Sequence, residues 1–166
     1  VDRRTTLAWL AAALAAMPEA ARGSGLEGTS WPELHLTPIT GPGYGVDPDL
    51  LNPKVPWALT LNKTELKAAA ALCDMILPAD GAYSAASAVG VPAFVDEWIS
   101  APYPRQQQDR ELIVAGLAWI DAESVRRSGK SFADASNAER AAISNDIAFA
   151  GKIKAGFEKP AACFSN

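Results

Sequence analysis

The stretch YPRQQQDRELIVAGLAWIDAESVRRSG, residues 103–129, decides the fold, because it carries the signals of one long helix from its start to its end. Pro104 suits the first helical turn, where the backbone N–H that proline lacks has no helical partner in any case. The middle of the stretch is apolar, with Leu112, Ile113, Leu117, Trp119 and Ile120. Gly129 then supplies the residue that can take the left-handed conformation of a helix C-cap. We predict a helix over about 104–128.

Two further helices are predicted before this stretch. Asn62 and Glu65 form a capping box, in which each side chain binds a backbone amide of the first turn. The apolar run that follows has helical spacing until Pro78 ends it. A second helix is expected over 91–100, because Pro92 suits a first turn, and its apolar side chains are expected on one side of the helix: Phe94, Val95, Trp98 and Ile99.

The segment after Gly129 predicts one more helix. Ser136 and Glu139 form a second capping box, and the apolar pattern continues to about Ala150. The chain shows no sustained alternation of apolar and polar residues, so strands are at most short ones in the segment 22–61. We therefore predict a mainly α protein whose helical body covers residues 62–166.

Residues 22–61 are predicted to form a long irregular arm. Glycine and proline recur along this segment, and a regular helix through them is improbable. The segment nevertheless carries many aromatic and aliphatic side chains, which favour burial over a solvated linker. We expect an extended arm that lies on an apolar surface, which belongs either to this chain or to a partner. The glycine-rich GPGYG, residues 41–45, is a weak candidate for a phosphate cradle, because Asp47-Pro48 and not a helix follows it.

The first 21 residues are typical of an export leader. Arg3 and Arg4 precede an uncharged, alanine-rich run from Leu7 to Met17. A cationic end followed by an apolar segment of this length is the order that secretory leaders need. Paired arginines before a weakly apolar run indicate a twin-arginine signal, which exports folded proteins. The alternative is an ordinary amphipathic N-terminal helix. No sharp cleavage site stands out before Pro18, and we expect residues 1–21 to be a leader helix that this chain retains.

Composition limits the classes of function. The chain has 166 residues and a net charge of −4, which gives no electrostatic footprint for nucleic acid or an anionic membrane. Its single histidine, His35, has no partner ligands at metal spacing. The two cysteines, Cys73 and Cys163, could pair in an oxidising compartment, although Cys73 also fits the apolar face of a helix as a buried thiol.

Catalytic motifs are missing from the sequence. It contains no Cys-x-x-Cys, no His-x-x-x-His and no Gly-x-Ser-x-Gly. Four carboxylates could be considered as an acid–base pair, but we interpret them as solvated surface charges: Asp74, Asp80, Asp96 and Glu97. We therefore predict no catalytic, cofactor-binding or metal-binding residue in this chain.

Three stretches of the chain together resemble the gluconate 2-dehydrogenase subunit 3 family. They are YGVDPDLLNPKVPWALTL at 44–61, DMILPAD at 74–80 with SAASAVGVPAFVDEWISAPYP at 84–104, and GLAWIDAES…FADAS at 116–136. The resemblance runs over most of residues 2–165, and family members usually continue past Phe164 with a glycine- and aromatic-rich tail.

The resemblance implies a non-catalytic small subunit of a periplasmic complex that is associated with the membrane. A large FAD-dependent subunit of the glucose-methanol-choline (GMC) oxidoreductase type would oxidise the sugar, and a cytochrome c subunit, in indirect or weak contact with this chain, would take the electrons. The small subunit would bind, stabilise and co-export the flavoprotein, with Arg3 and Arg4 as the export signal. Gluconate oxidation at C2 and glucoside oxidation at C3 both occur around this family, and the sequence does not choose between them. The alternatives are an export chaperone that leaves the mature complex, and a self-sufficient small redox enzyme.

Two aromatic residues of the arm are candidate contacts with the large subunit. Tyr44 and Trp57 lie in the family-like stretch 44–61, and Pro56 keeps the chain extended just before the Asn62 cap. Tyrosine and tryptophan are favoured interface anchors because they bury a large area with few rotatable bonds. The alternative is that both side chains cover the helices of this chain itself.

Overall fold

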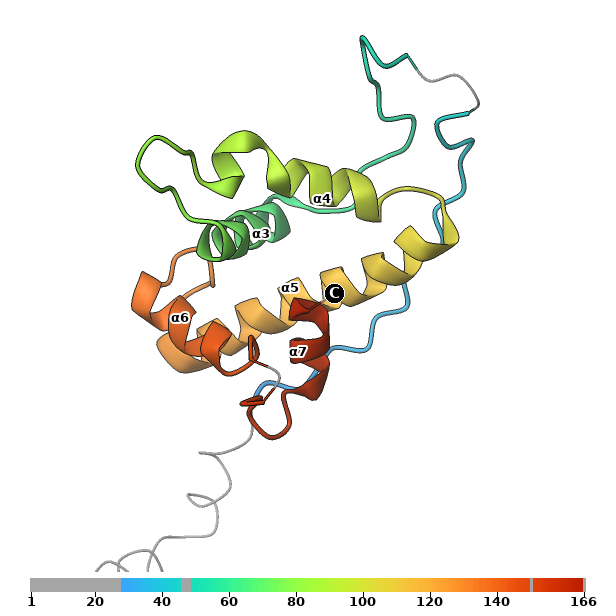
Figure 1. Cartoon of the computed structure of the whole chain (residues 1–166). Coiled ribbons are helices and arrows are strands. Elements are labelled where there is room, and N and C mark those ends of the chain that lie inside the picture. The colour runs from blue at the N-terminus through green and yellow to red at the C-terminus, as the bar shows by residue number, and fades with distance from the viewer. Residues whose placement is uncertain (1–27, 46–48, 150, 166) are drawn as a thin grey trace, which may run out of the picture.

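The computed structural model describes residues 28–45, 49–149 and 151–165. These residues form five α-helices and one short 3-10 helix, and they contain no β-strand beyond the isolated bridge between Asp80 and Tyr83 (Figure 1). The helices are α3 (Lys63–Ile76), η1 (Ala86–Val89), α4 (Val91–Ile99), α5 (Pro104–Ser128), α6 (Asn137–Asn145) and α7 (Glu158–Phe164). The predicted mainly α fold class is confirmed.

The long helix α5 is the centre of the fold. It contacts α3, α4, α6 and α7, whereas α3 and α4 also pack on each other and on η1. In Figure 1, α3 and α4 lie above α5, α7 lies below it, and α6 overlaps the C-terminal end of α5. The sequence that decides the fold therefore provides the helix on which the other four assemble.

The local signals that predicted the helix ends are present in the structure. The Asn62 side chain accepts hydrogen bonds from the amides of Thr64 (2.8 Å) and Glu65 (3.0 Å), and Glu65 in return accepts from the Asn62 amide (2.8 Å). Ser136 and Glu139 form the same reciprocal pair. At the end of α5, Gly129 has φ +72° and its amide donates to the Val125 carbonyl (2.8 Å). Both capping boxes and the glycine cap are thus confirmed.

Two features of the C-terminal part differ from the prediction. Helix α6 ends at Asn145, not near Ala150, because Ser144, Asn145 and Asp146 are consecutive short polar residues that compete for backbone hydrogen bonds. Helix α7 was not predicted. It has seven residues, and Pro160 lies in its first turn, where the missing N–H removes no helical hydrogen bond.

The core consists of two clusters, and helices α3 and α5 contribute to both. One cluster lies toward α6 and α7, and its buried side chains are Ala71, Trp119, Ile120, Phe132, Ile143, Ile147, Phe157 and Ala161. The other lies toward α3 and α4 and comprises Leu61, Ala68, Ala69, Ile99, Val114 and Leu117. Gly116 allows α7 to approach α5 closely, since a Cβ there would lie 2.3 Å from the Cys163 Sγ.

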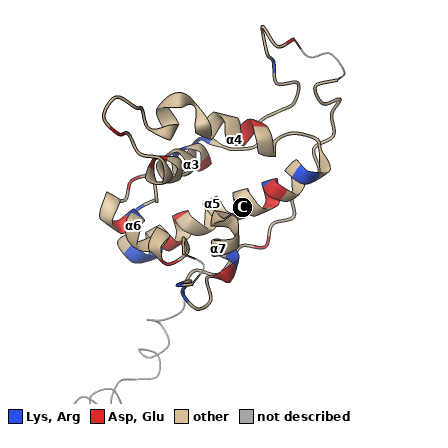
Figure 2. Cartoon of the chain, in the orientation of Figure 1, with Lys and Arg blue, Asp and Glu red and all other residues tan. Residues whose placement is uncertain are grey.

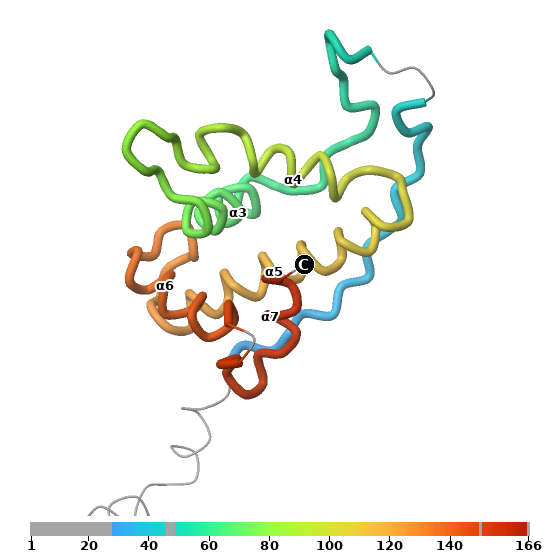
Figure 3. Tube along the Cα trace, viewed as in Figure 1, coloured from blue at the N-terminus to red at the C-terminus, as the bar shows by residue number. Residues whose placement is uncertain are grey.

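The described part of the arm has no helix, and it first runs along α5. Figure 3 shows it passing α5 and α7, extending into a loop beyond the start of α5, and then returning to α3. Hydrogen bonds confirm an antiparallel path, because Thr29 binds Glu123 near the end of α5, and Ile39 binds Gln107 near its start. The arm therefore lies on the helical body of its own chain over much of its length.

Candidate partner interface

The N-terminal end of the described arm is fixed to a buried carboxylate. Glu123 is fully buried, and one of its oxygens accepts from the Thr29 amide (3.0 Å) and the Thr29 hydroxyl (2.7 Å). Arg126 and Arg127 donate to the same carboxylate at 2.7–2.8 Å. The Trp119 indole N–H also donates to the Thr29 carbonyl (2.8 Å). We name these contacts the Glu123 clamp.

The charge of Glu123 is well compensated. Burial raises the pKa of this carboxyl, but hydrogen bonds from Arg126, Thr29 and Arg127 outweigh burial and hold the pKa well below its usual range. Glu123 therefore stays ionised, and the clamp combines ionic and neutral hydrogen bonds at one point. If Thr29 moved away, the buried charge of Glu123 would lose two hydrogen-bond donors, which is unfavourable. The buried carboxylate therefore holds this end of the arm in place.

A second carboxylate fixes the other end of the arm. Asp96 is only 1% exposed, and its Oδ1 accepts from the amides of Thr60 (3.0 Å) and Leu61 (2.9 Å) and from the Ser100 hydroxyl (3.2 Å). We name these contacts the Asp96 clasp. The interpretation of Asp96 as a solvated surface charge was therefore wrong. Its burial is compensated by backbone donors that come from the arm, 35 and 36 positions away.

The other three carboxylates considered in the sequence are not brought together as an acid–base pair. Asp74 accepts from the amide and hydroxyl of Ser87, and these hydrogen bonds lower its pKa. Asp80 is exposed in the turn between α3 and η1. Glu97 accepts a hydrogen bond from the Tyr44 hydroxyl instead of facing Asp96. Asp74 and Glu97 each bind a different partner, and Asp80 lies in a separate turn, so none of them forms an acid–base pair.

Between the clamp and the clasp, the arm brings Tyr44 and Trp57 together. Their ring centroids are 4.8 Å apart in an edge-to-face arrangement, and the Trp57 ring also lies edge-on to Tyr103, 6.1 Å away. The Trp57 indole donates to the Glu97 carbonyl (3.3 Å), and the Tyr44 amide donates to the Tyr103 hydroxyl (3.1 Å). The hydrogen bond to Glu97 is the main reason that the pKa of Tyr44 is raised to about 12.

Gly43 makes the close approach of the arm to Tyr103 possible. It is buried and has φ +64°, a conformation that favours glycine. A Cβ at this position would lie 2.6 Å from the Tyr103 hydroxyl oxygen. Gly43 thus has a structural role in a turn, and no helix that could bind phosphate follows the segment in the described residues 49–61.

Two aromatic side chains of α4 extend this cluster across the surface. Phe94 is 62% exposed and Trp98 is 39% exposed, and their ring centroids are 6.4 Å apart. The Trp98 indole donates to Asp109 (3.1 Å). We name the set the aromatic patch: Tyr44, Trp57, Phe94, Trp98 and Tyr103. A shallow hollow of about 240 Å³ lies among these five side chains.

The patch corrects the prediction for the helix at 91–100. The apolar side chains of α4 do not lie on one side, since Ile99 is fully buried while Phe94 and Trp98 are exposed. Adjacent helical positions point about 100° apart, so Val95 and Ile99 can face the core while their neighbours face outward. Sequence reasoning named Tyr44 and Trp57 as candidate contacts, and it did not name their neighbours Phe94, Trp98 and Tyr103. The available signal was that four bulky side chains at 94, 95, 98 and 99 are too many for one face of a short helix.

The patch offers a mainly apolar surface, because most of its hydrogen-bonding groups already have partners within the chain. Both indole N–H groups and the Tyr44 hydroxyl donate to groups of this chain, and the Tyr103 hydroxyl accepts a hydrogen bond. Figure 2 shows charges of both signs along α5. The outer loop of the arm, described over residues 41–45 and 49–56 and here named the arm loop, carries Asp49 and Lys54 as its charged residues in the described part. Such a surface suits apolar side chains of another protein better than a sugar or a phosphate, which need free donors and acceptors.

The two cysteines are free thiols that line one apolar cavity. Cys73 on α3 and Cys163 on α7 border a cavity of about 170 Å³ between α3, α5 and α7. The Cys163 thiol donates to the Leu112 carbonyl (3.4 Å), and burial raises its pKa to about 11. Burial also raises the pKa of Cys73. Both residues behave as partly buried small apolar groups, as proposed for Cys73.

The remaining sequence-based expectations concern the leader segment, His35 and metal binding. Arg3, Arg4 and the whole leader segment 1–21 lie outside the described residues. His35 is exposed. In the part of the chain that the structure describes, no group of three or more His, Cys, Asp or Glu side chains is placed to hold a metal ion. None of the described helices combines the length and apolar character needed to cross a membrane.

Comparison with known proteins gives one match. A family model described as gluconate 2-dehydrogenase subunit 3 matches residues 63–165, from the start of α3 to the end of α7. No curated protein and no solved structure matches the chain. The matched region contains the helical body and three residues of the aromatic patch, whereas the arm with Tyr44 and Trp57 lies outside it.

Proposed function

Because the chain belongs to the gluconate 2-dehydrogenase subunit 3 family, we propose that it is the non-catalytic small subunit of a periplasmic, flavin-dependent sugar dehydrogenase complex. In this proposal it binds and stabilises a large GMC-type oxidoreductase subunit that carries FAD. A cytochrome c subunit receives the electrons and has indirect or weak contact with this chain. The association with the membrane comes through the complex.

The observation that carries this proposal is the aromatic patch. Phe94, Trp98 and Tyr103 are between 39% and 62% exposed, although burying such side chains is favourable. Aromatic side chains with internally satisfied polar atoms are typical of the core of a protein–protein interface. We propose that the segment 44–61 lies against the large subunit and that Tyr44 and Trp57 lose their remaining exposure there.

A pull-down tests the subunit assignment. The tagged chain, expressed with the other proteins of its own complex, is expected to bring down a large subunit with flavin absorbance in a one-to-one ratio. The isolated chain is expected to have a flat visible spectrum and no dehydrogenase activity. A flavin or haem spectrum in the isolated chain would instead support the alternative of a small redox enzyme.

The proposed export role has its own test. Arg3 and Arg4 are both changed to lysine, which keeps the charge but removes the paired arginines of the signal. We expect this chain and the flavoprotein to remain together in the cytoplasm, with loss of periplasmic dehydrogenase activity. Undiminished periplasmic activity in the double variant would contradict export in partnership.

The pull-down of the tagged chain also distinguishes a subunit from an export chaperone. A chaperone would be absent from the mature periplasmic complex, whereas a subunit would be retained at a one-to-one ratio. We expect retention, because the chain offers an apolar surface that would otherwise stay exposed after export.

A further inference from the structure

The arm loop carries the most exposed large apolar side chains of the described residues. Leu50 is 82% exposed and Leu51 is 91% exposed, at the outer end of the arm. Burying a leucine side chain fully is worth about 1.5–3 kcal/mol. We name residues 49–52 the leucine tip. Its two leucines contribute little to the stability of this chain in the state described.

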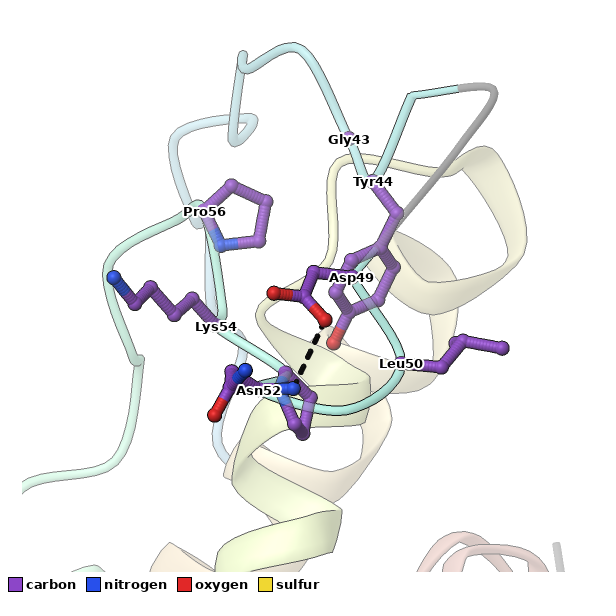
Figure 4. Close-up of a pocket in the computed structure, with 8 residues that line it drawn as sticks. Gly43, Tyr44, Asp49, Leu50, Asn52, Lys54 and Pro56 are labelled. Carbon is purple, nitrogen blue, oxygen red and sulfur yellow. Dashed lines mark hydrogen bonds between the residues drawn. The ribbon is translucent and has the colours of Figure 1, made fainter.

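The leucine tip is held in a defined shape. The Asp49 Oδ1 accepts from the amides of Leu51 (3.0 Å) and Asn52 (3.0 Å), which closes a tight turn, and Pro53 follows directly. Figure 4 shows the Leu50 side chain pointing away from those of Asp49, Lys54 and Pro56, which line the same hollow. A segment that is already ordered loses less conformational entropy on binding, so its exposed leucines are well prepared for contact.

The leucine tip and the aromatic patch are neighbouring parts of one surface. Tyr44 belongs to the patch, and it also lines the open hollow of about 820 Å³ that Leu50 and Lys54 line. The four most exposed aromatic side chains of the patch provide roughly 350 Å², since one whole aromatic side chain has about 150–250 Å². A standard interface takes about 800 Å² from each partner, so the patch alone is too small. The leucines supply apolar area directly beside it.

We propose that Leu50 and Leu51 insert into an apolar socket on the large FAD-dependent subunit, and that leucine tip and aromatic patch form one continuous interface. This inference rests on the proposed function and names the anchors of the contact. A projecting pair of leucines needs a concave apolar partner surface. On this chain the apolar cavity lies between α3, α5 and α7, on a different surface. The aromatic patch itself holds an apolar hollow of about 240 Å³ on the same surface, so a second copy is the competing occupant. Membership of a subunit family favours the large subunit, and the oligomeric state of the free chain tests the choice.

The test uses the tagged chain bound to the co-purified large subunit, followed by its flavin absorbance. The variant carries Leu50→Ala and Leu51→Ala. The matched control carries Ile76→Ala and Leu77→Ala, which are 58% and 61% exposed at the far end of α3. We expect the tip variant to bind the flavoprotein at least 30-fold more weakly and the control to bind within about threefold of the unmodified chain. Unchanged circular dichroism and melting temperature of the tip variant would show that the fold is intact.

Each outcome separates the inference from the proposed function. If the unmodified chain captures no flavoprotein, the proposed function fails. If it does capture the flavoprotein and the tip variant binds equally well, the function stands and the leucine tip is not an anchor. A larger loss of flavoprotein binding in the Ile76→Ala/Leu77→Ala control than in the tip variant would place the interface at the end of α3 and overturn the proposal. A dimer of the free chain that disappears in the tip variant would identify a second copy as the occupant and overturn the proposal.

Discussion

Trp119 in the helical body and Trp57 in the arm show the same side chain in two settings. Trp119 is 2% exposed, packs edge-on against Phe157 at 5.0 Å, and binds the Thr29 carbonyl. Trp57 is half-buried and packs edge-on against Tyr44 and Tyr103 near the surface. The body is held by apolar burial around α5. The arm is held by two buried carboxylates and by the packing of Trp31, Leu34 and Leu36 on the core, and its outer part carries exposed apolar area. The difference suggests that the body stabilises the fold and that the arm prepares a contact.

The largest effect is expected from removing the tryptophan of the body. Trp119→Ala leaves a cavity beside Phe157 and removes the hydrogen bond to Thr29, so we expect the free energy of unfolding to fall by about 3–5 kcal/mol. Urea unfolding followed by circular dichroism measures this loss. Phe149→Ala is the control, because Phe149 is 56% exposed and its removal should cost much less. Equal losses in both variants would mean that the body is not held by its buried core.

A smaller effect is expected from opening the Asp96 clasp. Asp96→Ala leaves the Leu61 amide without an acceptor, whereas the Thr60 amide keeps the Ser100 hydroxyl at 2.8 Å. An unsatisfied buried donor costs about 1–3 kcal/mol, and we expect a loss of stability within that range. Because the clasp holds the arm, limited proteolysis should cut faster between residues 49 and 59. Asp80→Ala removes an exposed carboxylate and is the control. An unchanged cleavage pattern would show that the arm stays in place without the clasp.

The next effect should be on the complex and not on the free chain. Trp57→Ala is expected to weaken binding to the large subunit by about 2 kcal/mol, as for an interface hot spot, with a smaller effect on the stability of the free chain. Titration of the complex by dilution and melting of the free chain give the two values. If binding is unchanged while the free chain melts at a lower temperature, Trp57 serves the internal packing of the arm.

The smallest effect near neutral pH is expected from the Glu123 clamp. The pKa of Glu123 is lower in the folded chain than in the unfolded chain, so ionised Glu123 contributes stability that is complete above the unfolded value of about 4.3. That contribution declines only as the pH falls below the unfolded value toward the lowered pKa. We expect no change from this group between pH 7 and pH 5, and a shallower acid decline in Glu123→Gln than in the unmodified chain. A loss of stability that begins above pH 5 and disappears in Glu123→Gln would contradict the lowered pKa.

Sequence reasoning predicted the features that neighbouring residues determine. The capping boxes at Asn62 and Ser136 act within three positions, and Pro104 and Gly129 mark the ends of α5 by their own backbone restrictions. Helix α7 escaped prediction because seven residues around Pro160 give too short a pattern. Its place depends on Gly116, which is far away in the sequence and allows the close contact with α5.

The candidate interface was predictable only in part, because its geometry depends on distant contacts. Tyr44 and Trp57 were recognisable as aromatic residues of an irregular segment. Their pairing with Tyr103 requires the arm to return to the start of α5, and no local pattern encodes that return. The burial of Asp96 has the same origin, since its donors belong to the arm. A carboxylate on a short helix looks like a surface charge until the segment that covers it is known.

The Glu123 clamp also has a consequence for the order of folding. Thr29 and Glu123 are 94 positions apart, so their contact closes a far longer loop than the contacts between successive helices. Contacts between distant residues generally form after local ones, and α5 must exist before it can receive the arm. We expect the Thr29 amide to gain protection from hydrogen exchange later than the amides of α5. The docked arm would then mark a chain whose helical body has already finished folding.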